Sequence, residues 1–77
     1  TGLTATPDDA QEMHQHIRDL LNSLFNPAIS QEISILYGGS CKPENASLLF
    51  SQKDIDGGLI GGASLVASSF IAIVNSF

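Results

Sequence analysis

Apolar residues recur at three- and four-residue intervals in the first part of the chain, with charged and amide side chains between them. Thr6, Pro7 and two acidic residues come directly before this pattern. A hydroxyl can cap a helix, proline fits the first helical position, and acids are stabilised near the positive end of the helix dipole. The pattern predicts an amphipathic helix that starts at Pro7 and ends near Asn26-Pro27. Its apolar face, which requires a partner surface, comprises Ala10, Met13, Ile17, Leu20, Leu21 and Leu24.

Two short apolar runs further along the chain each end in a pair of glycines and lead into a helical pattern. The first run, Ile33 to Tyr37, is β-branched and aromatic, and the second spans Gly57 to Ile60. Both are predicted to be strands. A helix is expected from Pro43, with Ala46, Leu49 and Phe50 on its apolar face, and a last helix is expected from Ser64-Leu65. The apolar face of the last helix comprises Val66, Phe70, Ile73, Val74 and Phe77.

The predicted order is therefore helix, strand, helix, strand, helix. This alternation favours an α/β fold with parallel strands, because a parallel pair needs a crossover that a helix supplies. Two strands are too few for a parallel sheet, which is normally buried on both faces. We therefore expect the chain to be part of a larger sheet or closed barrel, with the missing strands upstream of Thr1.

Composition and charge narrow the classes of function. The 77 residues carry eight acidic and three basic side chains, a net charge of -5, which argues against a nucleic-acid partner. The single cysteine, Cys41, cannot close an internal disulfide, and a small-apolar packing role is favoured for it over a reactive thiol. No signal peptide is recognised at the start, so a reducing, cytoplasmic setting is expected. His14 and His16 lack metal-ligand spacing and are expected on the solvated face of the first helix.

The two glycine pairs are the candidate chemistry. Glycine lets backbone N–H groups approach a ligand closely, and the following helix start adds partial positive charge. Taken singly, Gly38-Gly39 or Gly61-Gly62 is explained by a tight turn between a strand and a helix. Taken together, the pairs indicate a phosphate site, because (β/α)8 barrels frequently form one from the loops after their last two strands.

The residues around these loops resemble one family. Residues 37–45, YGGSCKPEN, are similar to the YGGS-x-x-P-x-N segment of triosephosphate isomerases, and residues 54–65, DIDGGLIGGASL, are similar to their DIDG-x-L-[VI]-GGASL segment. The opening TGLTATP resembles the end of the family's lid loop. On this resemblance, residues 1–77 are the C-terminal portion of a single TIM-barrel domain. Residues 1–6 would end the lid loop, and residues 37–42 and 60–65 would be the phosphate-binding loops.

The resemblance implies a glycolytic and gluconeogenic isomerase that interconverts dihydroxyacetone phosphate and glyceraldehyde 3-phosphate without a cofactor, as a homodimer in the cytoplasm. Ser40, Gly61 and Gly62 would donate backbone N–H groups to the substrate phosphate. Residues implied in the lid hinge and its latch are Gly2, Leu3, Thr4, Ala5, Tyr37 and Ser40. The family's catalytic lysine, histidine and glutamate lie upstream of the matching segment, so this chain is predicted to be inactive alone and to need the missing N-terminal portion of the barrel.

Several alternatives stay open at this point. The uncharged run from Gly57 to Phe77 could be read as a membrane span, although its glycines and serines favour the loop interpretation. Asn45-Ala46-Ser47 is formally a glycosylation sequon, for which helix content is the preferred explanation. Another phosphate-binding barrel, such as an aldolase or an indole-pathway isomerase, would share the loops. The alternative function is a non-enzymatic, self-assembling or complementing module driven by apolar helix faces and unpaired strand edges.

Overall fold

The computed structural model describes residues 5–77, so Leu3 and Thr4 of the expected lid hinge and Gly2 of the expected latch lie outside the described part. The helices are α1 (Pro7–Leu24), α2 (Pro27–Glu32), α3 (Pro43–Phe50) and α4 (Ala67–Val74), with a 3-10 helix, η1 (Gly62–Leu65), directly before α4. The strands are β1 (Leu36–Tyr37) and β2 (Gly57–Gly58). The result is an α/β arrangement, as the alternating pattern predicted.

β1 and β2 pair in parallel, with Leu36 opposite Gly57 and Tyr37 opposite Gly58. Backbone bonds extend the pairing at both ends, because the Asp56 N–H donates to the Ile35 carbonyl at 3.0 Å and the Leu59 N–H donates to the Tyr37 carbonyl at 2.9 Å. The parallel prediction is confirmed. Both strands are shorter than the predicted ranges 33–37 and 57–60, because each has only one neighbouring strand within residues 5–77 to continue its ladder.

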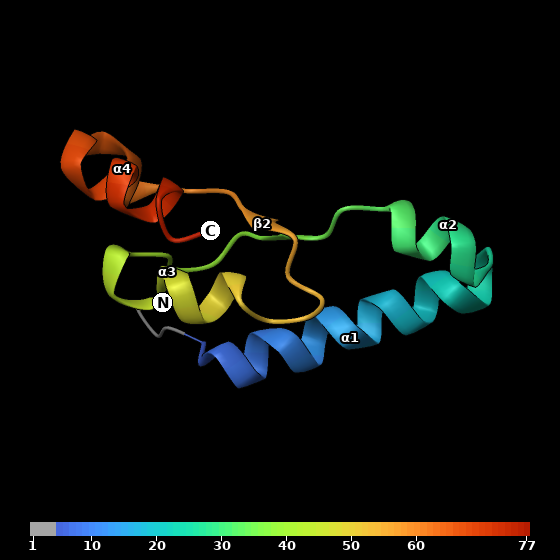
Figure 1. Ribbon diagram of the computed structural model, residues 1–77. Coiled ribbons are helices and arrows are strands. Elements are labelled where there is room, and N and C mark those ends of the chain that lie inside the picture. The colour runs from blue at the N-terminus through green and yellow to red at the C-terminus, as the bar shows by residue number, and fades with distance from the viewer. Residues whose placement is uncertain (1–4) are drawn as a thin grey trace.

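The helices form a connected series of contacts. α3 contacts both α1 and α4, and α2 folds back against the end of α1 (Figure 1). The buried apolar residues come from α1, β1, α3, α4 and two loops, and α2 contributes none of them. They are Ala10, Tyr37, Cys41, Ala46, Leu49, Ile55 and Ile73. Ala46 and Leu49 are fully buried, which confirms the predicted inner face of α3.

The helix starts follow from local chemistry. The Thr6 side chain accepts a hydrogen bond from the Asp9 N–H at 3.1 Å, as expected for the cap of a helix beginning at Pro7. Asn26 caps α2 in the same way, accepting from the Ile29 N–H at 2.9 Å. The sequence pattern predicts only the end of a helix at Asn26-Pro27, so α2 is an additional helix that was not expected. An amide cap followed by proline was the signal that could have found it.

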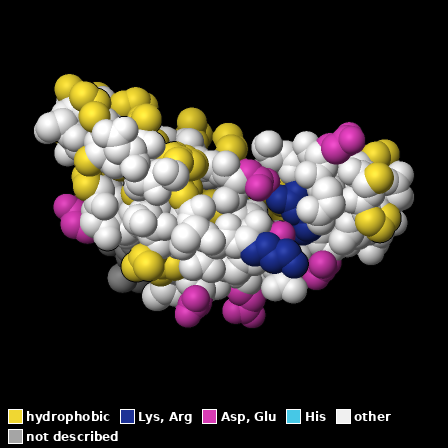
Figure 2. All heavy atoms as spheres, viewed as in Figure 1, with side chains coloured by type: hydrophobic (Ala, Val, Ile, Leu, Met, Phe, Trp, Pro, Cys, Tyr) yellow, Lys and Arg dark blue, Asp and Glu magenta, His cyan; other side chains and the backbone are white. Residues whose placement is uncertain are grey.

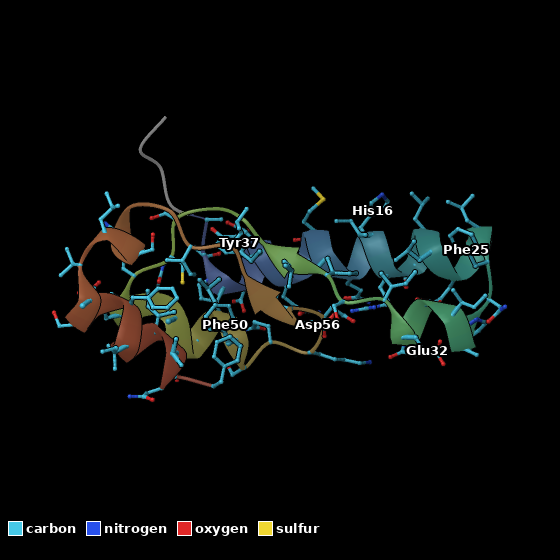
Figure 3. All side chains as sticks on the ribbon, turned by 90° about the horizontal axis from the view of Figure 1, so that it is seen from above. His16, Phe25, Glu32, Tyr37, Phe50 and Asp56 are labelled. Atoms are coloured by element: carbon cyan, nitrogen blue, oxygen red, sulfur yellow. The ribbon has the colours of Figure 1, made fainter. Side chains whose placement is uncertain are left out.

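The inner face of α1 differs from the expected one. The residues of α1 that are buried are Ala10, His14 and Arg18. Met13, Leu20 and Leu24 from the predicted apolar face are 59%, 53% and 68% exposed. The placement of His14 on a solvated face was therefore wrong, whereas His16 is exposed and projects away from the strands (Figure 3). The polar residues are buried because residues 30–33, at the end of α2 and directly after it, and loop 54–56 provide partners for them. Of the predicted apolar face, Ala10 is buried as expected.

The last helix also begins later than predicted. η1 occupies Gly62–Leu65, and α4 starts only at Ala67, so the expected start at Ser64-Leu65 is a 3-10 turn. On α4, Ile73 is 1% exposed, while Phe70 and Val74 remain 40% and 51% exposed. Figure 2 shows hydrophobic side chains gathered on the surface over α4.

The chain is more extended than a closed domain of its length. Its radius of gyration is 13.3 Å, compared with about 11.5 Å expected for a compact domain of this size. Its solvent-accessible surface is 5182 Å², compared with about 4,500 Å² expected from its mass. The additional solvent-accessible surface coincides with exposed apolar faces on α1 and α4. These dimensions fit a segment whose core is completed by further chain.

Candidate phosphate-binding site

The two glycine loops line one cavity of about 320 Å³. Because β1 and β2 are parallel, their carboxyl ends meet at the same edge of the sheet, and the loops that follow them meet there too. The walls are residues 38–42 from the first loop and 59–63 from the second. Ser40, Gly61 and Gly62, which the resemblance marks as phosphate donors, all belong to these walls.

Several backbone N–H groups in these loops donate to no other protein group within residues 5–77. Among residues 5–77, none of the hydrogen bonds uses the N–H of Gly39, Ser40, Cys41 or Gly61 as donor. The Gly61 carbonyl, by contrast, is occupied by the Ser64 N–H at 2.9 Å and the Ser64 hydroxyl at 2.6 Å. A cavity bordered by free N–H donors is suited to an anion.

The first loop is fixed to the start of α3 by Asn45. The Asn45 side-chain oxygen accepts from the Lys42 N–H at 2.7 Å, and its amide nitrogen donates to the Ser40 carbonyl at 3.2 Å. Asn45 lies in α3, as the helical interpretation of the sequon expected. Its side chain satisfies groups that the loop and the helix start would otherwise leave unpaired.

The Tyr37 ring restricts which residue can occupy position 39, two residues further along the loop. Its side chain is only 8% exposed. A Cβ added to Gly39 would stand 2.6 Å from the Tyr37 Cζ, closer than real Cβ contacts allow, whereas a Cβ on Gly38 would meet nothing within 4 Å. On the other side, the His14 ring lies 6.3 Å from the Tyr37 ring, tilted by 41°. A side chain at position 39 would therefore force the Tyr37 ring to move.

Cys41 is part of the core next to the cavity. It is 7% exposed and belongs to the buried apolar cluster, which confirms the packing role. Burial raises the pKa of the Cys41 thiol above its ordinary value, because the thiolate is poorly solvated there. A raised pKa lowers the fraction of reactive thiolate at neutral pH.

A second polar cluster, centred on Arg18, was not found from the sequence. The Arg18 guanidinium donates to the carbonyls of Ser30 and Ile33, each at 2.6 Å, and to the Asp56 carboxylate at 2.7 Å. Arg18 Nε also approaches Asp54 Oδ1 at 3.5 Å, which is an ion-pair distance without the geometry of a hydrogen bond. The cluster joins α1 to the segments before β1 and β2.

His14 and Asp56 make further hydrogen bonds at this cluster. The His14 ring nitrogen Nδ1 bonds the Asp54 carbonyl at 3.1 Å, so Nδ1 carries the proton. Burial acts to raise the pKa of Asp56, but the Ile35 N–H and Arg18 outweigh it and hold this pKa below its ordinary value. Because the cluster precedes both strands, it lies at the opposite end of the strands from the glycine loops. Its role is to position the strands that carry those loops.

Of the residues expected in the lid hinge, only Ala5 is within the described part, where it is exposed. Tyr37 precedes the first loop directly and is buried beneath it. Within residues 5–77, none of the helices is both long and apolar enough to cross a membrane.

The fold and the site together define the class of protein as a parallel α/β segment with a cavity shared by two glycine loops at the carboxyl ends of its strands. The family model described as triosephosphate isomerase matches residues 1–77. The chain is 61% identical over 77 residues to the triosephosphate isomerase of Marinobacter nauticus, covering 100% of this chain and 30% of that relative. It is 58% identical over 76 residues to that of Flavobacterium johnsoniae, covering 99% of this chain and 30% of that relative. The chain belongs to the triosephosphate isomerase family and spans about 30% of the length of these relatives.

Proposed function

We propose that this chain is the C-terminal portion of a triosephosphate isomerase barrel and supplies the loops that bind the substrate phosphate. The observation that carries the proposal is the single cavity between the two glycine loops, bordered by N–H groups without acceptors. The relatives are named triosephosphate isomerases, and the chain covers 30% of them. In this proposal the substrate is a triose phosphate, no cofactor takes part, and the complete protein is a cytoplasmic homodimer.

Ser40, Gly61 and Gly62 are the proposed phosphate donors, each through its backbone N–H. An anion bound there would gain charge-assisted hydrogen bonds without requiring a fixed cation. The proposed lid hinge comprises Leu3, Thr4 and Ala5, and the proposed latch joins Tyr37 and Ser40 to Ala5 and Gly2. Burial of the Tyr37 ring supports the latch, because a fixed ring can present its hydroxyl with little loss of entropy.

The chain alone is proposed to have no isomerase activity. The family's general base and electrophile are expected in the N-terminal portion of the barrel, and loss of both costs many orders of magnitude in rate. The open apolar faces of α1 and α4 support this division, since they fit the surfaces that further strands and helices of a barrel would cover.

The test is complementation. The chain is mixed with a second chain that holds the residues preceding the matching segment in the Marinobacter nauticus relative, and isomerase turnover is measured for each chain and for the mixture. Turnover only in the mixture supports the proposal. Turnover by the 77-residue chain alone would contradict its inactivity.

A matched pair of variants at Gly62 links any restored turnover to the cavity. A Cβ at Gly62 would meet nothing within 4 Å, so both Gly62→Asp and Gly62→Asn fit the described structure. Asp repels a phosphate dianion, whereas Asn has the same size without the charge. The mixture should lose more turnover with Asp than with Asn, and equal losses would count against phosphate binding at this loop.

The alternative function is a non-enzymatic module that assembles with copies of itself. The exposed apolar residues on α1 and α4 and the two open strand edges favour it for the isolated chain. Sedimentation velocity of the 77-residue chain distinguishes the two functions when read with the complementation test. A stable homo-oligomer that gives no turnover in the mixture favours the assembly function.

A further inference from the structure

The three basic side chains of this acidic chain have different surroundings. Arg18 is 6% exposed, and its guanidinium is occupied by two carbonyls and two carboxylates. Lys53 borders a separate polar cavity beside Gln15 and Asp54. Lys42 is exposed and is the basic residue in the wall of the cavity between the glycine loops. Among residues 5–77, no carboxylate lies within ion-pair distance of the Lys42 ammonium.

The backbone of Lys42 is already committed to the start of α3. Its N–H donates to the Asn45 side chain at 2.7 Å, and its carbonyl accepts from the N–H groups of Asn45 and Ala46 at 3.1 and 3.0 Å. These bonds fix the Cα of Lys42 at the rim of the cavity. Only the ammonium group of Lys42 is therefore left to interact with a ligand.

The Lys42 ammonium is the charged group in an otherwise uncharged cavity wall. None of the residues in the wall is acidic, and apart from Lys42 all of them are uncharged. The whole chain carries a net charge of -5, which would repel an anion approaching from solution. A single unpaired cation at the rim offsets that repulsion locally, because exposed charges act over roughly 10 Å at 0.1 M salt.

We propose that Lys42 is a further phosphate-positioning residue, which attracts and retains the substrate dianion at the cavity through its charge. The inference rests on the proposed function and deepens it, since the backbone donors orient the phosphate and Lys42 supplies the only formal charge in the described wall. Because the side chain is exposed and flexible, its effect is electrostatic and sensitive to salt. It should act on phosphate affinity and KM, and leave kcat nearly unchanged.

The experiment uses the full-length protein that contains this chain, with inorganic phosphate as the probe and triose phosphate turnover as a second measurement. Lys42→Gln removes the charge, Lys42→Arg retains it, and Lys53→Gln makes the same change of net charge away from the cavity. At low ionic strength, Lys42→Gln should weaken phosphate binding about three- to tenfold, and the difference should shrink in 0.5 M salt. Lys42→Arg should restore most of the affinity, and Lys53→Gln should change it less than about 1.5-fold.

Two results separate failure of the inference from failure of the proposed function. If the unaltered protein binds phosphate and Lys42→Gln behaves like Lys53→Gln, Lys42 has no positioning role and the proposed function is unaffected. If the unaltered protein does not bind phosphate, the proposed function fails, and the inference fails with it. An equal loss of kcat and affinity in Lys42→Gln would also overturn the inference, because it would indicate a damaged loop.

Discussion

Replacing Arg18 by methionine removes the buried cation that joins α1 to the segments before both strands. The change leaves the Ser30 and Ile33 carbonyls without their 2.6 Å donors. It also leaves Asp54, whose side chain is 10% exposed, without a cationic neighbour. The lost contact with Asp56 contributes less to the destabilisation, because the Asp56 side chain is 35% exposed and water can replace the guanidinium.

The size of the expected loss in the free energy of unfolding follows from these contacts. Each buried carbonyl without a partner costs about 1–3 kcal/mol. Breaking a buried ion pair by removing one partner costs about 3–5 kcal/mol in total. Because methionine fills part of the volume of the arginine stem, we expect Arg18→Met to lower the free energy of unfolding by about 3–5 kcal/mol. Arg18→Lys should retain only a small part of the stability lost in Arg18→Met, since an ammonium cannot reproduce the planar arrangement of donors in the guanidinium.

The assay is urea unfolding of the full-length protein that contains this chain, followed by circular dichroism. Lys53→Met is the matched control, because it removes an exposed positive charge and should change the free energy of unfolding by less than about 0.5 kcal/mol. The double variant Arg18→Met/Asp54→Asn should be less destabilised than the sum of its single changes. A loss below about 1 kcal/mol for Arg18→Met, with an unchanged denaturant slope, would refute the reasoning.

Three further predictions test the site and its supports. Gly39→Ala should displace the Tyr37 ring and weaken phosphate binding, whereas Gly38→Ala, whose Cβ meets nothing within 4 Å, should leave binding nearly unchanged. Because the folded-state pKa of Asp56 lies below its ordinary value of 3.8, its contribution to stability is present above about that pH and is lost as pH falls through the lower folded pKa. Asp56→Asn should therefore flatten the fall in the free energy of unfolding as the pH drops below about 3.8, and an identical pH profile would contradict this origin. Burial raises the pKa of the Cys41 thiol, so its alkylation by iodoacetamide at pH 8 should be slower than that of free cysteine, and faster alkylation would show an accessible thiolate.

The sequence predicted most of the candidate site because the signals there are local. Gly38-Gly39 and Gly61-Gly62 each follow an apolar run and precede a helix start, and parallel pairing brings such loops to one edge. The lining of the cavity by both loops follows from that topology. The positions of residues 1–4 stay predictions, since these residues lie outside the described part.

At Gly39 the preference for glycine is set by tertiary packing. The buried Tyr37 ring stands too close to position 39 for a Cβ there. The local sequence of the turn does not reveal this contact. Tyr37 and Gly39 are two residues apart in sequence, and the tyrosine constrains the glycine only through the conformation of its side chain. That constraint depends on the packing that buries the tyrosine.

The sequence by itself determined where α1, α2 and α3 begin, whereas α4 begins later than its local pattern predicted. Thr6 and Pro7 start α1 through interactions within one helical turn, and Asn26 and Pro27 start α2 in the same way. The sequence also determined the alternation of helices and strands, since hydrophobic periodicity is a property of each segment alone. Neither depends on distant parts of the chain.

Only the tertiary structure decided which face of α1 is buried and how long the strands are. Periodicity favoured the face with Met13 and Leu24, yet His14 and Arg18 are buried, because residues 30–33 and 54–56 bring acceptors to them. Burying an arginine is unfavourable unless such partners are present, and the sequence does not reveal which distant residues will meet it. Strand length likewise depends on neighbouring strands, because a ladder continues only where another backbone lies beside it.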